Sequence, residues 1–199
     1  MIKLIIISIV TFLFIGCSTT VPAVAEYRIN TLSPDTAFNE SGCKKQSLKI
    51  AQAFSSSSLM SNKMSYGLGT HKQYKFTESQ WAESPNRAIS AAVLEYVKST
   101  ELFNSVQISK SRSKNGLLME TNIEEFMQYF SADEKESLVR AKINLTLIDA
   151  QASKVLASKT FTSEVEVEEL NADKGVIALN RALQNILEES GEWLSGVCR

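Results

Sequence analysis

Few residues of this sequence have the types and spacing that enzymatic chemistry needs. The sole histidine, His71, lies in an expected surface turn, so neither a histidine-based nucleophile triad nor a multi-histidine metal site is expected. The glycines of Gly67–Gly69 precede an expected strand, whereas a phosphate-binding loop opens a helix. The acidic groups are interpreted as a solvated turn and a solvated strand face: Asp133, Glu134 and Glu136, and Glu164, Glu166 and Glu168. We therefore expect no catalytic site, no cofactor and no metal.

Cys17 is the residue with the clearest chemistry. The apolar run before it, Leu4–Ile15, follows the single cation Lys3 and is shorter than the roughly 20 residues of a spanning helix. A short positive start followed by an apolar run is typical of a secretory signal. The stretch Leu13–Cys17 resembles the bacterial lipobox, whose cysteine receives a lipid through a thioether and becomes the first mature residue. We predict a signal peptide at 1–16 and a palmitate-containing lipid on Cys17; a transmembrane anchor with an incidental cysteine is the alternative.

The residues after Cys17 bear on where the protein lies. Asp at position 18 would resemble the inner-membrane retention signal of bacterial lipoproteins, so Ser18 favours the outer membrane, with the domain facing the periplasm; the inner membrane is the alternative. Segment 17–41 mixes Ser, Thr, Pro and small residues without a period, which predicts a lipidated tether. The piece Tyr27–Ile29 can instead pair as a strand and order the far end of that tether.

Two further cysteines, Cys43 and Cys198, remain after lipidation. An even number of thiols in an oxidising compartment is what a disulfide requires. We predict that these two pair and join the last helix to the start of the sheet. Two unpaired thiols, or a bond between chains, are the alternatives.

Length and charge limit the remaining possibilities. Residues 42–199 have the size of a single domain. The formal net charge of the 199-residue chain is −1, so it carries no overall electrostatic signature of nucleic-acid binding.

The first half of the domain contains a short predicted strand that begins at Leu48 and Ile50, then a predicted hairpin and a predicted helix. Apolar residues alternate on both sides of a turn at residues 62–77, at Met64, Tyr66 and Leu68 and then at Tyr74 and Phe76. A helix is expected to begin at Ser84-Pro85, because Ser is a good N-cap and Pro suits the first helical position.

The second half predicts a short strand near Val106–Ile108, then three longer strands and a helix. Residues 117–130 have an irregular period that indicates a bulge, 139–147 alternate strictly, and 155–167 alternate again after a turn. An apolar stripe from Asp173 to about Ser195 predicts a helix that covers one face of the sheet. The expected fold is α+β: a mainly antiparallel sheet with two helices on one face, in the order β-β-β-α-β-β-β-β-α.

One segment carries a family resemblance. The stretch YKFTESQWAESPNRAI at 74–89 runs from a strand into the first helix. Here the chain resembles the ABC-type transport auxiliary lipoproteins, the family of paraquat-inducible protein C, in which a hairpin strand ends in Trp-Ala-Glu-x-Pro. In this sequence those residues are Trp81, Ala82, Glu83 and Pro85. The resemblance covers roughly residues 40–195, and the stretch SSSSLMSNK stands where relatives often have a Pro-Tyr-Leu type of sequence.

The resemblance implies a non-catalytic lipoprotein subunit of a transport system that moves lipids between the inner and outer membranes. Its partners would be a periplasmic MCE-domain protein, a permease and an ATPase, and it would anchor or extend the lipid conduit at the membrane. For the contact we predict Tyr66, Tyr74, Phe76 and Trp81, because aromatic side chains dominate interface energetics, although some of them can belong to the core. Because MCE proteins form rings, a homo-oligomer joined through edge strands is also expected.

Two other classes remain open. An outer-membrane scaffold lipoprotein for envelope or lipopolysaccharide assembly would share the lipid anchor and the fold but not the MCE partner. A small-ligand binding protein would need a pocket with a polar rim, which the sequence does not reveal.

Overall fold

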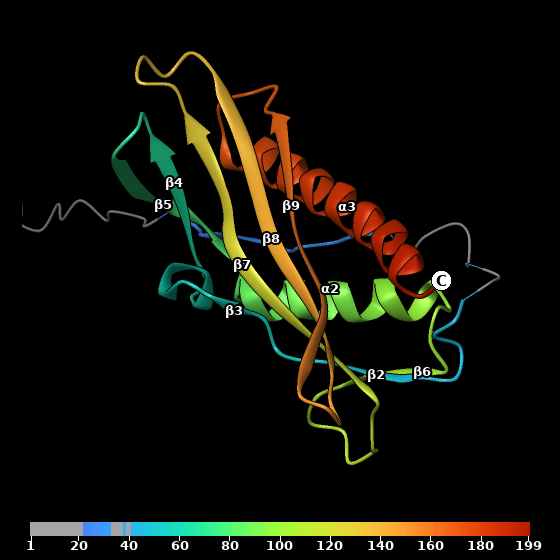
Figure 1. Ribbon diagram of the computed structural model, residues 1–199. Coiled ribbons are helices and arrows are strands. Elements are labelled where there is room, and N and C mark those ends of the chain that lie inside the picture. The colour runs from blue at the N-terminus through green and yellow to red at the C-terminus, as the bar shows by residue number, and fades with distance from the viewer. Residues whose placement is uncertain (1–21, 33–37, 39–40) are drawn as a thin grey trace, which may run out of the picture.

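The computed structural model describes residues 22–32, 38 and 41–199, and within them one nine-stranded sheet packs against two long helices (Figure 1). The strands are β1 (Ala25–Tyr27), β2 (Ser47–Ile50), β3 (Phe54–Ser55), β4 (Lys63–Leu68), β5 (Lys72–Trp81), β6 (Ser105–Ile108), β7 (Leu117–Phe130), β8 (Ser137–Asp149) and β9 (Lys154–Glu166). The helices are the 3₁₀ turn η1 (Ser57–Met60), α2 (Pro85–Ser99) and α3 (Ala172–Val197). This confirms the α+β class.

The three long strands β7, β8 and β9 form the antiparallel half of the sheet. Their core face contains the strictly alternating positions of β8, all of them buried: Val139, Ala141, Ile143, Leu145 and Leu147. The register of β7 shifts between Ile123 and Glu125, so Glu124 forms the bulge that the sequence predicts. The opposite face carries polar side chains and faces solvent.

The prediction of a mainly antiparallel sheet is only partly right in the other half, where the predicted hairpin of β4 and β5 is antiparallel but the remaining pairings are parallel. Strands β2, β3 and β4 all run parallel to β7, β6 runs parallel to β2, and β1 runs parallel to β5. The chain from 47 to 68 passes once along the edge of β7, interrupted by η1. The chain then returns through β5 and α2, so β7 runs in the same direction as β2, β3 and β4. A crossover connection of this kind gives parallel strand pairs.

Both predicted helices form. Helix α2 has Pro85 at its first position, as expected, although the side chain of Ser84 makes no capping hydrogen bond. Helix α3 begins after Asn171, whose Oδ1 accepts from the Lys174 backbone N–H at 2.9 Å and so satisfies one of the free donors of the first turn. Buried residues of both helices join the core cluster that forms on the sheet.

The described residues that precede residue 42 pack on the rest of the protein. Strand β1 pairs with β5, and the backbone N–H groups of Asn30 and Leu32 donate to Asn180 and Gln184 of α3. The far end of the expected tether is therefore ordered. This was the alternative expectation for the tether, based on the piece Tyr27–Ile29. The predicted signal peptide and Cys17 lie outside the described residues. Of the helices in the described ranges, none has the length and apolar character to cross a bilayer.

Cys43 and Cys198 form a disulfide, as the sequence predicts. Their Cα atoms are 5.2 Å apart, and the bond closes a sequence separation of 155 residues. Next to it, the Gly42 backbone N–H donates to the Cys198 carbonyl oxygen at 2.5 Å. The end of α3 is thus fixed to the segment that leads into β2.

Candidate partner-binding site

Four aromatic side chains meet where the β4–β5 hairpin lies beside the end of β7. The ring of Tyr66 lies 5.6 Å from that of Tyr74, 4.6 Å from Phe76 and 5.3 Å from Phe130, measured between centroids. These separations are typical of interacting aromatic pairs. Tyr74 is 43% exposed, and the other three are half-buried. We call these four residues the hairpin cluster, a partly exposed apolar surface.

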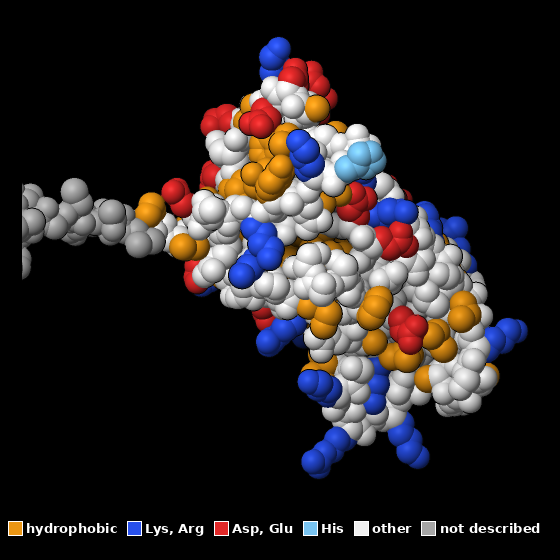
Figure 2. Space-filling view, turned by 90° about the vertical axis from the view of Figure 1, so that its left-hand side faces the viewer, with side chains coloured by type: hydrophobic (Ala, Val, Ile, Leu, Met, Phe, Trp, Pro, Cys, Tyr) orange, Lys and Arg blue, Asp and Glu red, His pale blue; other side chains and the backbone are white. Residues whose placement is uncertain are grey.

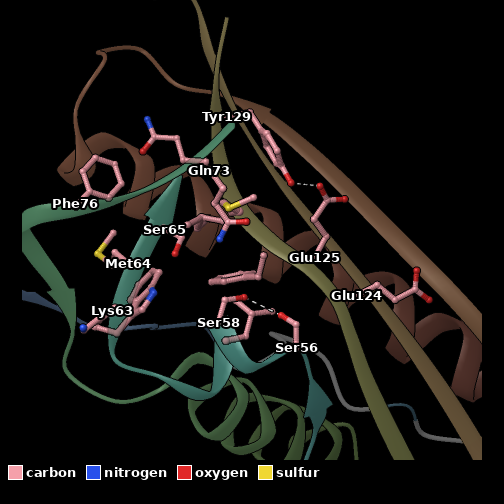
Figure 3. A pocket seen from close by; sticks show the side chains of 16 residues that line it. Ser56, Ser58, Lys63, Met64, Ser65, Gln73, Phe76, Glu124, Glu125 and Tyr129 are labelled. Atoms are coloured by element: carbon pink, nitrogen blue, oxygen red, sulfur yellow. Dashed lines mark hydrogen bonds between the residues drawn. The ribbon is translucent and has the colours of Figure 1, made fainter. Parts of the chain in front are cut away.

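A pocket lies beside the hairpin cluster because the sheet has a gap (Figure 3). Strand β3 pairs with β7 as far as Ile123, and β4 pairs with it only from Gln128 onwards. Between these points η1 leads the chain away, so residues 124–127 of β7 have a strand partner only on the β8 side. The resulting space, which we call the sheet pocket, has a volume of about 240 Å³.

The deep part of the sheet pocket is apolar. Trp81 is only 4% exposed and its ring lies 6.0 Å from that of Phe126. Leu179 of α3 also lines the pocket and is buried. Phe76 belongs to both the hairpin cluster and the pocket lining, so the two features form one continuous surface.

The rim of the sheet pocket is polar and ionic. Tyr129 donates its hydroxyl hydrogen to Glu125, as Figure 3 shows, and Arg140 also contacts Glu125. Burial, followed by the hydrogen bond and the charge of Glu125, raises the pKa of Tyr129 well above its ordinary value. The bulge residue Glu124 pairs with Lys142 at 2.8 Å. The carboxylates of Glu124 and Glu125 on this rim therefore already have hydrogen-bond or ion-pair partners within the protein.

The sheet pocket and the hairpin cluster together offer a surface that a protein partner can contact. Across the described residues no cluster of three metal-ligating side chains occurs. The pocket is smaller than the 300–1,000 Å³ typical of small-molecule sites. An apolar floor of this size beside partly exposed aromatic rings can receive a few side chains of a protein partner.

The predicted interface residues separate into two groups. Tyr66, Tyr74 and Phe76 come together on the hairpin, whereas Trp81 is a core residue that reaches only the pocket floor. The backbone of Trp81 also stabilises the fold, since the Trp81 N–H donates to the Asn62 carbonyl oxygen at 2.7 Å. His71 lies in the hairpin turn, where it is exposed.

Sequence reasoning missed Phe130 and the Tyr129–Glu125 pair. Phe130 ends β7, 64 residues after Tyr66, and meets it because Leu68 pairs with Phe130. Only the parallel register of β4 and β7 brings these residues together. Local periodicity contains no sign of that register.

Comparisons with known proteins agree on the fold. A Xanthomonas campestris protein of the DUF330 family is similar with a TM-score of 0.76 at 13% identity, over 87% of this chain and 96% of that one. A second solved protein, described only as uncharacterized, gives 0.67 at 13% identity, over 87% and 99%. A hypothetical protein from Chlamydia trachomatis gives 0.50 at 9% identity, over 77% and 98%. A search of curated proteins found no match.

The sequence itself identifies the family. Residues 28–189 match the family described as the ABC-type transport auxiliary lipoprotein component. The match begins just after β1 and ends inside α3, so it includes the hairpin cluster, the sheet pocket and the whole sheet except the first strand. The chain therefore belongs to the ABC-type transport auxiliary lipoprotein family.

Proposed function

We propose that this protein is a non-catalytic subunit of an MCE-type ABC transport system that moves lipids between the inner and outer membranes. Membership of the transport auxiliary lipoprotein family supports an association with an ABC transporter. The observation that carries the proposed contact is the hairpin cluster, where Tyr74 remains 43% exposed although it packs against Tyr66. Partly exposed aromatic side chains next to a small pocket with an apolar floor are typical of binding hot spots.

The proposed anchor is a lipid on Cys17 in the outer membrane. At most about 18 Å of covalent chain separates Cys17 from Pro22, the first described residue. Because β1 follows at Ala25, the β1 edge of the sheet would lie close to the bilayer. Durable attachment needs more than one acyl chain, which the diacylglycerol thioether supplies.

In this proposal the domain works mechanically. The lipid holds it at the membrane, and the hairpin cluster with the sheet pocket binds an MCE-domain protein. The domain then fixes the far end of the conduit or forms part of its wall. The permease and the ATPase belong to the same assembly without contacting this site directly.

A symmetric oligomer would match a ring of MCE-domain proteins. Strand β9 (Lys154–Glu166) pairs only with β8 among the described strands, so its other edge has unpaired backbone groups available for a second copy. We propose this edge as the subunit contact. Light scattering of the purified protein at micromolar concentration tests it, and a monomer alone would contradict it.

Isolation of the tagged protein from bacterial membranes tests the proposed function. Mass spectrometry of the co-purified proteins should identify an MCE-domain protein with an ABC permease and an ATPase. A variant with Tyr74→Ala and Phe76→Ala should lose these partners while remaining folded, because Tyr74 is exposed and Phe76 is half-buried. Co-purification of envelope or lipopolysaccharide assembly proteins alone would favour the scaffold alternative and contradict the transport proposal.

A further inference from the structure

Two loops meet at the end of the sheet opposite the hairpin (Figure 1). Loop 109–116 leads from β6 into β7, and turn 150–153 joins β8 to β9. The Ala150 backbone N–H donates to the Gly116 carbonyl at 2.9 Å, which holds the two together. We call residues 108–116 with 149–156 the basic tip.

The basic tip concentrates positive charge. It carries four cationic side chains, all exposed, and one carboxylate, Asp149: the cations are Lys110, Arg112, Lys114 and Lys154. Oδ1 of Asp149 already accepts the backbone N–H groups of Gln151 and Ala152, both at 2.9 Å. Throughout the described part of the chain, no carboxylate forms a salt bridge with any of the four cations. Figure 2 shows Lys and Arg side chains projecting from the lower end of the molecule.

The cations stand on a formed loop. Nζ of Lys49 donates to the Ser111 carbonyl at 2.8 Å, and the Ser113 hydroxyl donates to Gln107 at 2.6 Å. At the other end of the loop, Nδ2 of Asn115 donates to the Leu117 carbonyl at 2.7 Å. Because these bonds fix the backbone, little further ordering of the loop is required when an anionic surface binds.

Aliphatic side chains flank the charges. Ile108, Val155 and Leu156 are each about half exposed. Cations beside exposed aliphatic side chains match the boundary between phospholipid headgroups and acyl chains, where both kinds of group find a partner. The competing occupant is an acidic protein surface that also carries an apolar patch, and the experiment below distinguishes it from a bilayer.

We propose that the basic tip docks on the surface of a bilayer that contains anionic phospholipids. The phosphate groups bind the four cations, and Ile108, Val155 and Leu156 reach the acyl boundary. Four such cations strengthen association with an anionic surface by on the order of 10²–10³-fold, and salt weakens it. This contact would be a second membrane attachment besides Cys17, and it needs no transport partner.

Lysine footprinting of the full chain tests the proposal. The protein purified from membranes is reconstituted into vesicles of phosphatidylcholine, alone or with about one third phosphatidylglycerol. Acetylation of each lysine by a water-soluble ester is then followed by mass spectrometry. With phosphatidylglycerol, labelling of Lys110, Lys114 and Lys154 should slow about fivefold or more, and salt at about 0.5 M should reverse this. Lys72, Lys75 and Lys98, which are exposed elsewhere on the surface, should not change.

A matched pair of variants makes the result specific. In the variant with Lys110→Gln, Arg112→Gln and Lys114→Gln, the protection of Lys154 by phosphatidylglycerol should disappear, because the remaining charge no longer holds the tip. The control variant with Lys72→Gln, Lys75→Gln and Lys98→Gln should keep it. Equal labelling of the tip lysines in both vesicle types would overturn the proposal. So would protection that appears only when an isolated protein partner is added.

Discussion

A Cβ atom added to Gly67 would lie 2.5 Å from Cδ1 of Tyr129. The β4–β5 hairpin and strand β7 are therefore so close here that Gly67 has room only for a hydrogen atom. The Tyr129 ring cannot move away freely, because its hydroxyl group is bonded to Glu125. Gly67→Ala should therefore lower the free energy of unfolding by about 1–3 kcal/mol. Urea unfolding measures this change.

Two controls separate this clash from a general effect of alanine. In a Tyr129→Ala background, Gly67→Ala should cost much less, because the ring is absent. Gly196→Ala in α3, where a Cβ meets open space, should be neutral or slightly stabilising, since alanine favours helices. A Gly67→Ala protein as stable as the parent would show that the ring does not restrict this position.

Trp81 and Tyr74 should differ strongly in their effect on stability. Trp81 is buried against Phe126, so Trp81→Ala should destabilise the fold by about 3–5 kcal/mol. Tyr74 is exposed for much of its surface, so Tyr74→Ala should cost about 1 kcal/mol or less. Thermal unfolding of the two variants checks this, and equal losses would mean that Tyr74 belongs to the core.

The disulfide should contribute several kcal/mol of stability. For a separation of 155 residues, loop-closure entropy gives about 5 kcal/mol as an upper figure. Cys43→Ser and Cys198→Ser should lower the melting temperature by similar amounts, and the double variant should lose little more, because each change removes the same link. A double variant with twice the loss of either single variant would contradict this.

The pKa of Tyr129 predicts a loss of stability in alkaline solution. Burial and Glu125 raise this pKa above the ordinary value of 10.0, so the folded state keeps a proton that the unfolded chain releases. The contribution is complete below about pH 10 and decreases as the pH rises further. Tyr129→Phe should flatten the dependence of unfolding free energy on pH above 10. Part of the pH dependence that remains in the Tyr129→Phe variant comes from Tyr96, whose pKa is raised mainly by burial and then by the charges of Glu188 and Glu192.

Local sequence patterns predicted the elements with strong periods. Strand β8 alternates strictly because one face is buried, and helix α2 begins at Pro85 because proline fits only the first turn. The bulge at Glu124 was visible because it breaks the alternation of β7. The disulfide followed from the count of cysteines and the expected compartment.

The parallel half of the sheet could not be predicted in the same way. The alternation of Leu48 and Ile50 indicates β2 as a strand, but β3 has only two residues and shows no period. The partners of both strands on β7 lie 68 or 69 positions later. The four serines at 55–58 gave no sign of η1, which opens the sheet pocket. Pairing over such distances depends on the whole fold, so Phe130 and the pocket were found only in the structure.

Lipid attachment at Cys17 predicts a simple labelling result. Radioactive palmitate fed to the bacteria should enter the parent protein and not the Cys17→Ser variant, because only the thiol can form the thioether. The Cys43→Ser variant is the matched control and should label normally. Label in the Cys17→Ser protein would contradict this attachment.

Photo-crosslinking at the hairpin cluster tests the proposed transport role most directly. A photoreactive amino acid replaces Tyr74 in the living bacterium, and the crosslinked product is identified by mass spectrometry. The same amino acid in place of Ser158, exposed on the polar face of β9, is the control. The proposal predicts a crosslink from position 74, and not from 158, to an MCE-domain protein. Crosslinks from position 74 only to proteins outside any ABC transport system would contradict it.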